Sequence, residues 1–149
     1  MVKPNILMKP VLTKEEHDLL VGAIREQEAR TSAEIRVCVT HKFIWRPERY
    51  AWRVFDQTGM RGTRLRNGAL IVMMPRIKKV VILGDCGLHA VVPDGYWDEA
   101  VAAMIRRLRQ AGPLAALREG LRGLGDTLAA HWPRQAGDVN ELADEILGD

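Results

Sequence analysis

Apolar residues recur at helical spacing in four stretches of the chain. The first opens with Thr13-Lys14-Glu15-Glu16, the pattern in which a threonine hydroxyl and a glutamate carboxylate cap a first helical turn. A proline at the first helical position favours a second helix from Pro47. In the last stretch, leucines at positions 114, 117, 121, 124 and 128 share one face, which we interpret as core. We therefore predict helices over residues 13–30, 47–56, 96–111 and 114–132.

Between the helices lie segments with strand patterns. Residues 34–41 alternate polar and apolar side chains, which predicts a strand buried on one face only. Residues 69–74 and 79–83 are continuous apolar runs, as in strands covered on both faces. Their short connection predicts an antiparallel hairpin, and we expect the chain to continue extended over residues 88–92. The order α-β-α-β-β-α-α predicts a three-layer α/β/α sandwich around a mixed sheet.

Length and composition change this picture little. The 149 residues suit one domain, with an N-terminal arm over 1–11 and an acidic loop and short helix over 134–149. The longest apolar run, 69–74, is far shorter than the ~20 residues of a membrane-spanning helix. Residues 1–12 mix lysines and prolines among the apolar residues, so they do not form a signal-peptide core. We expect a cytoplasmic protein.

Charge is distributed unevenly. The segment from Lys42 to Arg66 holds seven basic residues and two acidic ones, whereas the segment from Asp138 to Asp149 holds five acidic residues and no basic one. The first could bind an anion, and the second a cation. The two cysteines do not form a disulfide framework: Cys38 is expected to be a small buried side chain, and Cys86 to lie in a glycine-rich loop.

Two acidic positions are candidate metal ligands. Asp85 follows an apolar strand, where ligand groups of open α/β sheets gather, but it could equally stabilise its own turn. Asp138, Asn140 and Glu141 offer three oxygen ligands within four residues, as hard cations prefer. Their alternative role is to cap the final helix and to interact with its dipole. The segment is not an EF-hand, because Ala143 stands where the loop needs glycine.

A third candidate is the basic, aromatic segment over 45–56. Three arginines fall at helical spacing on one face, with aromatic residues between them, a composition that can bind phosphate and stack on bases. The more economical interpretation is that the aromatic residues pack the helix down and leave the arginines in solvent. The chain carries no recognised nucleic-acid module, so nucleic acid is not the favoured partner. The residues concerned are Arg46, Arg49 and Arg53 with Trp45, Tyr50, Trp52 and Phe55.

Several short motifs together resemble the TPM-domain family, named for a thylakoid lumen acid phosphatase, a photosystem II repair protein and a modulator of acetylcholine receptors. They run in the family's order over nearly the whole chain. The matching sequence segments include Leu12-Thr13-Lys14-Glu15-Glu16, residues 28–37 (EARTSAEIRV), Arg66-Asn67-Gly68-Ala69-Leu70-Ile71, residues 81–89 (VILGDCGLH), His131-Trp132-Pro133 and residues 140–146 (NELADEI).

The resemblance implies an α/β/α sandwich around a four-stranded sheet, and a divalent cation, calcium or magnesium, held where two loops meet. The matching residues are Asp85 in one loop and Asp138, Asn140 and Glu141 in the other. Many members carry a signal peptide and a membrane helix, so this chain resembles the soluble, stand-alone form. Ala143 stands where relatives often have proline.

Three functions follow as hypotheses. The first is a regulatory or interaction module whose loops are ordered by the cation. The second is a weak metal-assisted acid phosphatase, an activity ascribed to some plant members, in which Arg61, Arg64 and Arg66 would hold the phosphoryl anion; the chain lacks the common phosphatase nucleophile motifs. The third is a module that binds an unknown protein partner through the basic aromatic helix.

Overall fold

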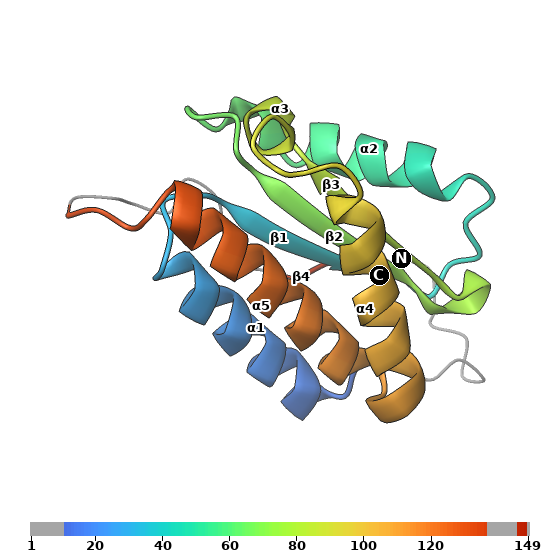
Figure 1. The fold of residues 1–149 in the computed structure, drawn as a ribbon. Helices are drawn as coiled ribbons and strands as arrows, with labels where there is room; N and C mark the ends of the chain where they lie inside the picture. The colour runs from blue at the N-terminus through green and yellow to red at the C-terminus, as the bar shows by residue number, and fades with distance from the viewer. Residues whose placement is uncertain (1–10, 137–145, 149) are drawn as a thin grey trace.

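The computed structural model describes residues 11–136 and 146–148, which form a mixed four-stranded sheet between two layers of helices (Figure 1). The helix α2 covers one face of the sheet, and α1, α4 and α5 cover the other. The α/β/α sandwich predicted from the sequence is therefore confirmed. The elements are α1 (Lys14–Glu28), β1 (Ile35–Val39), α2 (Pro47–Gln57), η1 (Met60–Gly62), β2 (Ala69–Met74), η2 (Pro75–Ile77), β3 (Lys79–Gly84), α3 (Cys86–His89), α4 (Tyr96–Ala111), α5 (Pro113–His131) and β4 (Ile146–Gly148).

The four predicted helices begin at, or within one residue of, the expected positions. At the start of α1, the Thr13 hydroxyl accepts from the Glu16 amide and the Glu16 carboxylate accepts from the Thr13 amide, each over 3.1 Å, so the capping box is present. Pro47 and Pro113 occupy the first positions of α2 and α5. The leucine face of α5 is buried against the sheet, as expected of core.

Strand order is β3-β2-β1-β4. The strands β2 and β3 pair antiparallel, with Ala69 opposite Gly84, which confirms the predicted hairpin. The strand β1 is parallel to β2 and to β4. Because of these directions, the end of β3 and the beginnings of the other three strands lie at one end of the sheet. This end, called the β3 exit below, carries Asp85.

Two expectations about the strands were wrong. The strand β1 is buried on both faces rather than one, and Arg36 is only 6% exposed, because α2 and the turn after it cover the side on which polar residues alternate. Residues 88–92 do not continue β3; the chain turns at once into the short helix α3.

The C-terminal segment also differs from its prediction. Residues 146–148, assigned to the acidic loop and short helix, form β4. The remainder of that predicted helix, from Asn140 to residue 145, lies outside the described residues.

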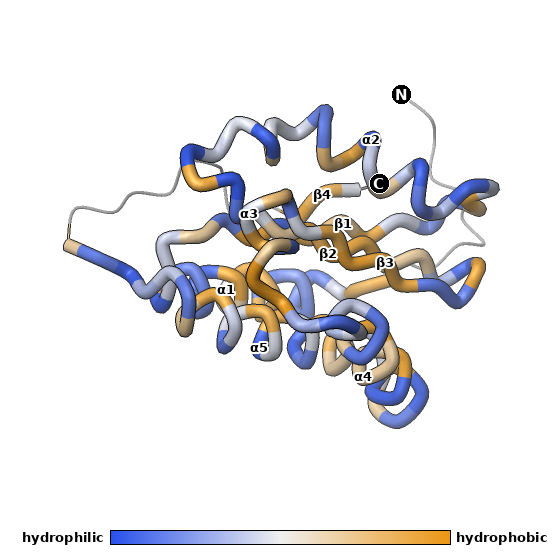
Figure 2. The backbone as a smooth tube through the Cα atoms, turned by 45° about the horizontal axis from the view of Figure 1, so that its top comes forward, coloured by the Kyte–Doolittle hydropathy of each residue, from blue (hydrophilic) through white to orange (hydrophobic). Residues whose placement is uncertain are grey.

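Each face of the sheet has its own core. Toward α1, α4 and α5 the core contains Val37, Ile71 and Leu117, and toward α2 it contains Phe55 and Val72. The apolar strands run between helices whose outer sides are hydrophilic (Figure 2). No helix of the described part of the chain is long and apolar enough to cross a membrane.

Candidate functional site

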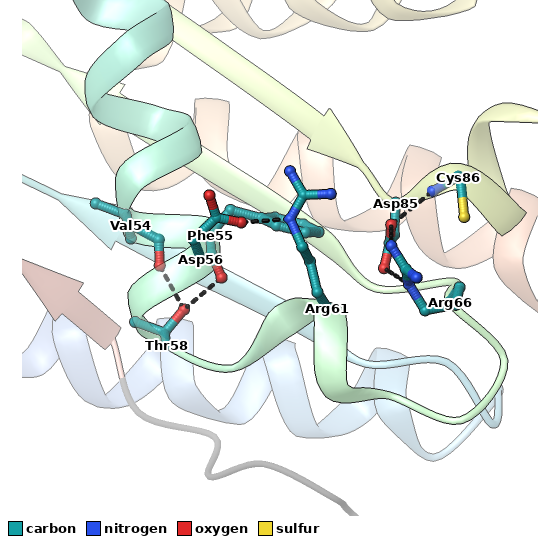
Figure 3. A network of polar contacts seen from close by, with 8 residues as sticks. All are labelled: Val54, Phe55, Asp56, Thr58, Arg61, Arg66, Asp85 and Cys86. Atoms are coloured by element: carbon teal, nitrogen blue, oxygen red, sulfur yellow. Dashed lines mark hydrogen bonds and ion pairs between the residues drawn. The ribbon is translucent and has the colours of Figure 1, made fainter.

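The β3 exit is organised by an ion pair between Asp85 and Arg66. The Asp85 side chain is 1% exposed, and both of its oxygens accept from the Arg66 guanidinium, Oδ2 from Nε over 2.7 Å and Oδ1 from Nη2 over 2.9 Å. Oδ1 also accepts from the Cys86 amide over 2.7 Å, so Asp85 caps α3. Figure 3 shows this pair beside the loop that follows α2.

The hairpin register brings this pair together. The Asp85 amide donates to the Gly68 carbonyl, and the Gly87 amide donates to the Arg66 carbonyl over 2.8 Å. The residues just before β2 therefore lie beside those just after β3. Arg66 takes a left-handed backbone conformation, with φ of 52°, which turns the loop at this point.

The ion pair sets the charge state of Asp85. Burial raises the pKa of the carboxyl, but the hydrogen bonds from Arg66 and from the Cys86 amide oppose it, and the pKa lies below its usual value. The pKa of Arg66 is raised because it bonds to the Asp85 carboxylate. Asp85 is therefore an ionised carboxylate whose charge is balanced within the chain.

Acid should remove the contribution of Asp85 to stability. A carboxyl whose pKa is lowered on folding stabilises the protein above its unfolded pKa of about 3.9, and this stabilisation is lost as pH falls through the folded pKa. We expect Asp85→Asn to be less stable than the wild type at neutral pH, and the difference between their free energies of unfolding to decrease below about pH 4. Urea unfolding of both proteins across this pH range measures this difference. A difference that does not change with pH would contradict a role for the charge.

The residues predicted to hold a cation are only partly within the described chain. Asp138, Asn140 and Glu141 lie outside it. Asp85 lies inside, but a guanidinium occupies both of its oxygens and supplies the positive charge that a cation would bring. Among residues 11–136 and 146–148 no three His, Cys, Asp or Glu side chains gather as metal ligands. The described residues therefore do not fit a divalent cation by themselves.

The three arginines predicted to hold an anion are not brought together on one ligand. Arg66 binds Asp85. Arg61 binds Asp56 through Nε (Figure 3). Its guanidinium carbon also lies over the ring of Trp52, 5.2 Å from the ring centroid. Arg64 is exposed. Two of the three thus already have carboxylate partners.

The basic aromatic segment forms a second candidate site, at the start of α2. A hollow of about 430 Å³ is lined by the loop before the helix and by the helix itself. We call it the basic aromatic surface: Phe43, Ile44, Trp45, Arg46, Arg49, Tyr50 and Arg53.

The expectation that the aromatic residues pack down is right for only some of them. Phe55 is fully buried, and Tyr50 is half-buried with its hydroxyl 4.0 Å from the sulfur of Cys38. Trp45 is 82% exposed and Trp52 38% exposed. The arginines do lie in solvent, as expected.

The acidic residues of α2 are both bound elsewhere. Glu48 contacts Lys79 of β3 over 2.7 Å, and Asp56 contacts Arg61. Within the described chain no ion pair joins a carboxylate to Arg46, Arg49 or Arg53. Among the residues that the structure describes, the surface therefore offers three unpaired guanidinium groups beside the exposed rings of Phe43 and Trp45.

Comparison with known proteins decides the family. The family model described as the TPM domain matches residues 8–127. The chain belongs to the TPM-domain family. The match includes Asp85 and all the arginines named above, and it ends before Asp138. No curated protein matched significantly.

Solved structures of similar chains agree. BA42 protein from the psychrophilic bacterium Bizionia argentinensis is 34% identical, with 95% of this chain and 98% of that chain covered and a TM-score of 0.87. The N-terminal domain of a P. gingivalis protein is 19% identical (82% and 79% covered, TM-score 0.69), and that of cg2496 from Corynebacterium glutamicum is 15% identical (87% and 81%, TM-score 0.62). The last two share the fold alone.

Sequence reasoning missed two features of these sites in this TPM domain. It named Asp85 and Arg66 separately and gave them different ligands, although the predicted hairpin already places the residues before 69 beside those after 84. It also passed over Phe43, which is 59% exposed in the basic aromatic surface. The signal was a large aromatic residue two positions before Trp45, in a loop.

Proposed function

We propose that this TPM domain is a binding module that recognises an acidic segment of a partner protein through its basic aromatic surface. The observation that carries the proposal is the placement of Arg46, Arg49 and Arg53 around one hollow, with the acids of the same helix turned to other partners. Exposed arginine and tryptophan are the residues that most often dominate protein interfaces. Trp45 supplies the apolar contact, and the guanidinium groups bind carboxylates in pairs of hydrogen bonds.

Replacing the three arginines should weaken this recognition strongly. Poly-L-glutamate is a suitable acidic probe, and its affinity for an Arg46→Gln/Arg49→Gln/Arg53→Gln protein should fall at least about tenfold, a loss of about 1.4 kcal/mol. Isothermal calorimetry measures it. Wild-type affinity should also fall with salt, since exposed charges are screened.

A matched control has the same charge change on the opposite face. Arg106, Arg107 and Arg109 are exposed on α4, so their replacement by glutamine should leave poly-L-glutamate binding nearly unchanged. Equal losses of affinity in both triple variants would show that net charge alone controls binding. That result would refute the basic aromatic surface as the binding site. Binding to anionic phospholipid vesicles but not to poly-L-glutamate would assign the surface to lipid headgroups instead.

Divalent-cation binding by Asp85, Asp138, Asn140 and Glu141 remains a second hypothesis. One observation favours it: β4 begins at Ile146, at the end of the sheet where Asp85 follows β3. Calcium titration of the metal-free protein is the test, and a shared site requires weaker binding in both Asp85→Asn and Asp138→Asn. Weaker calcium binding in Asp138→Asn alone would show that Asp85 is not a ligand of the cation.

The acid phosphatase hypothesis has a separate test. It requires that a phosphomonoester be turned over by the wild type and not by a folded Asp85→Asn protein. Equal turnover by the two proteins would refute it.

A further inference from the structure

The edge strand β3 has an open side. It is the outermost strand of the described sheet and pairs only with β2. The Asp85 amide donates to the Gly68 carbonyl opposite it. Positions that bond across an antiparallel ladder alternate along it, so Leu83 and Val81 also bond to β2. The backbone groups of the residues between them, Val80, Ile82 and Gly84, therefore point away from β2.

A groove follows this open side. It has a volume of about 420 Å³, and its floor includes Ile82, Leu83 and Gly84. Trp52 of α2 lines it from one side of the sheet and Trp97 of α4 from the other, because the two helices cover opposite faces. A groove whose floor is a strand edge and whose walls are aromatic has the geometry of strand addition.

We infer that this groove binds a short extended segment of a partner protein, which adds to β3 as a further strand. Its backbone would exchange hydrogen bonds with Ile82. Side chains of a strand alternate between the two faces of a sheet. Successive residues of the segment would therefore contact Trp52 and Trp97 in turn, and two neighbouring apolar residues fit best.

The end of the groove near α3 selects an acidic residue. Arg61 binds Asp56 through Nε, and the terminal amino groups of its guanidinium remain as donors toward the groove. The indole of Trp97 donates to Nδ1 of His89 over 3.1 Å, so a neutral His89 carries its proton on Nε2, a further donor. The carboxylate of Asp85 is balanced by Arg66. A carboxylate of the segment thus finds donors here.

The edge also lacks the usual protection against pairing. Natural edge strands are blunted by proline, bulges or charged side chains. The interior of β3, Val80 to Leu83, has only apolar residues, and its charged residue at the start, Lys79, binds Glu48. This inference is independent of the proposed function, because it concerns a different surface.

The test begins with nine-residue peptides selected from a random display library against the whole chain. We expect selected peptides with adjacent apolar residues and an acidic residue. In a scan of the selected peptide, methylation of backbone nitrogens should weaken binding at least about tenfold at every second position and little at the positions between, since only alternate N–H groups face β3. This readout leaves the protein unchanged.

Protein variants locate the peptide. Trp52→Ala should weaken binding severalfold, while Leu19→Ala, which removes an exposed apolar side chain of α1 outside the groove, should not. Amide NMR shifts on binding should centre on Ile82 to Gly84. Equal effects of Trp52→Ala and Leu19→Ala, methylation effects without a two-residue period, or a selection that yields no binding peptide would each overturn the inference.

Discussion

Replacing Arg66 by alanine should destabilise the protein, because it leaves the Asp85 carboxylate, whose side chain is 1% exposed, without its counter-charge. The cost should stay below that of breaking a fully buried pair because Arg66 itself is 42% exposed. The Cys86 amide would still donate to Asp85, but one hydrogen bond does not balance a buried charge. Urea unfolding at neutral pH measures the loss.

Arg64 gives the control. It lies two residues earlier in the same loop and is exposed, so Arg64→Ala should change the free energy of unfolding by no more than about 0.5 kcal/mol. The pKa of Asp85 should rise in Arg66→Ala and stay low in Arg64→Ala, which carboxyl NMR titration can follow. A loss below about 1 kcal/mol in Arg66→Ala would show that the pair is a weak surface ion pair.

Gly87→Ala should have an effect of similar size for a steric reason. A Cβ atom at Gly87 would lie 2.6 Å from the carbonyl oxygen of Leu65 and 2.7 Å from that of Arg66. Both obstacles are backbone atoms of the loop before β2, so no side-chain rotation relieves them. We expect a loss of about 2 kcal/mol or more by thermal or urea unfolding.

A glycine without neighbours makes the matched control. At Gly22, inside α1, an added Cβ meets nothing within 4 Å, so Gly22→Ala should stabilise the protein by up to about 1 kcal/mol. Gly87→Ala also shifts the loop that carries Arg66, so its cost and that of Arg66→Ala should sum to more than the cost of the double variant. Wild-type stability in Gly87→Ala would contradict the close approach.

The sequence predicted the elements that depend on local pattern. The periodicity of α1, α2, α4 and α5, the capping box at Thr13 and the short link between β2 and β3 all concern residues close together in the chain. The prediction that β1 is buried on one face only was wrong because tertiary packing covers its other face. Alternation at Arg36 is typical of a half-exposed strand, and only the packing of α2 against that face shows that the polar side is covered.

The candidate sites were predicted less completely. Their residue types were identified, but which charges neutralise each other depends on register and on helix rotation. Glu48 lies beside Arg49 in the sequence, yet it binds Lys79 across the space between α2 and β3. The strand β4 has too few apolar residues to give a signal of its own. The short helix α3 was missed because Gly84 stands just before it and Gly87 lies within it.

The pairing of β4 with β1 has a consequence for biosynthesis. Val37 pairs with Ile146, so the two strands leave the ribosome far apart in time. Until β4 is made, the outer edge of β1 is open while the rest of the sheet is already able to form. Contacts between such distant positions form late and slowly. The nascent chain therefore passes through a stage in which a chaperone, or another nascent chain, can reach the edge of β1 before β4 pairs with it.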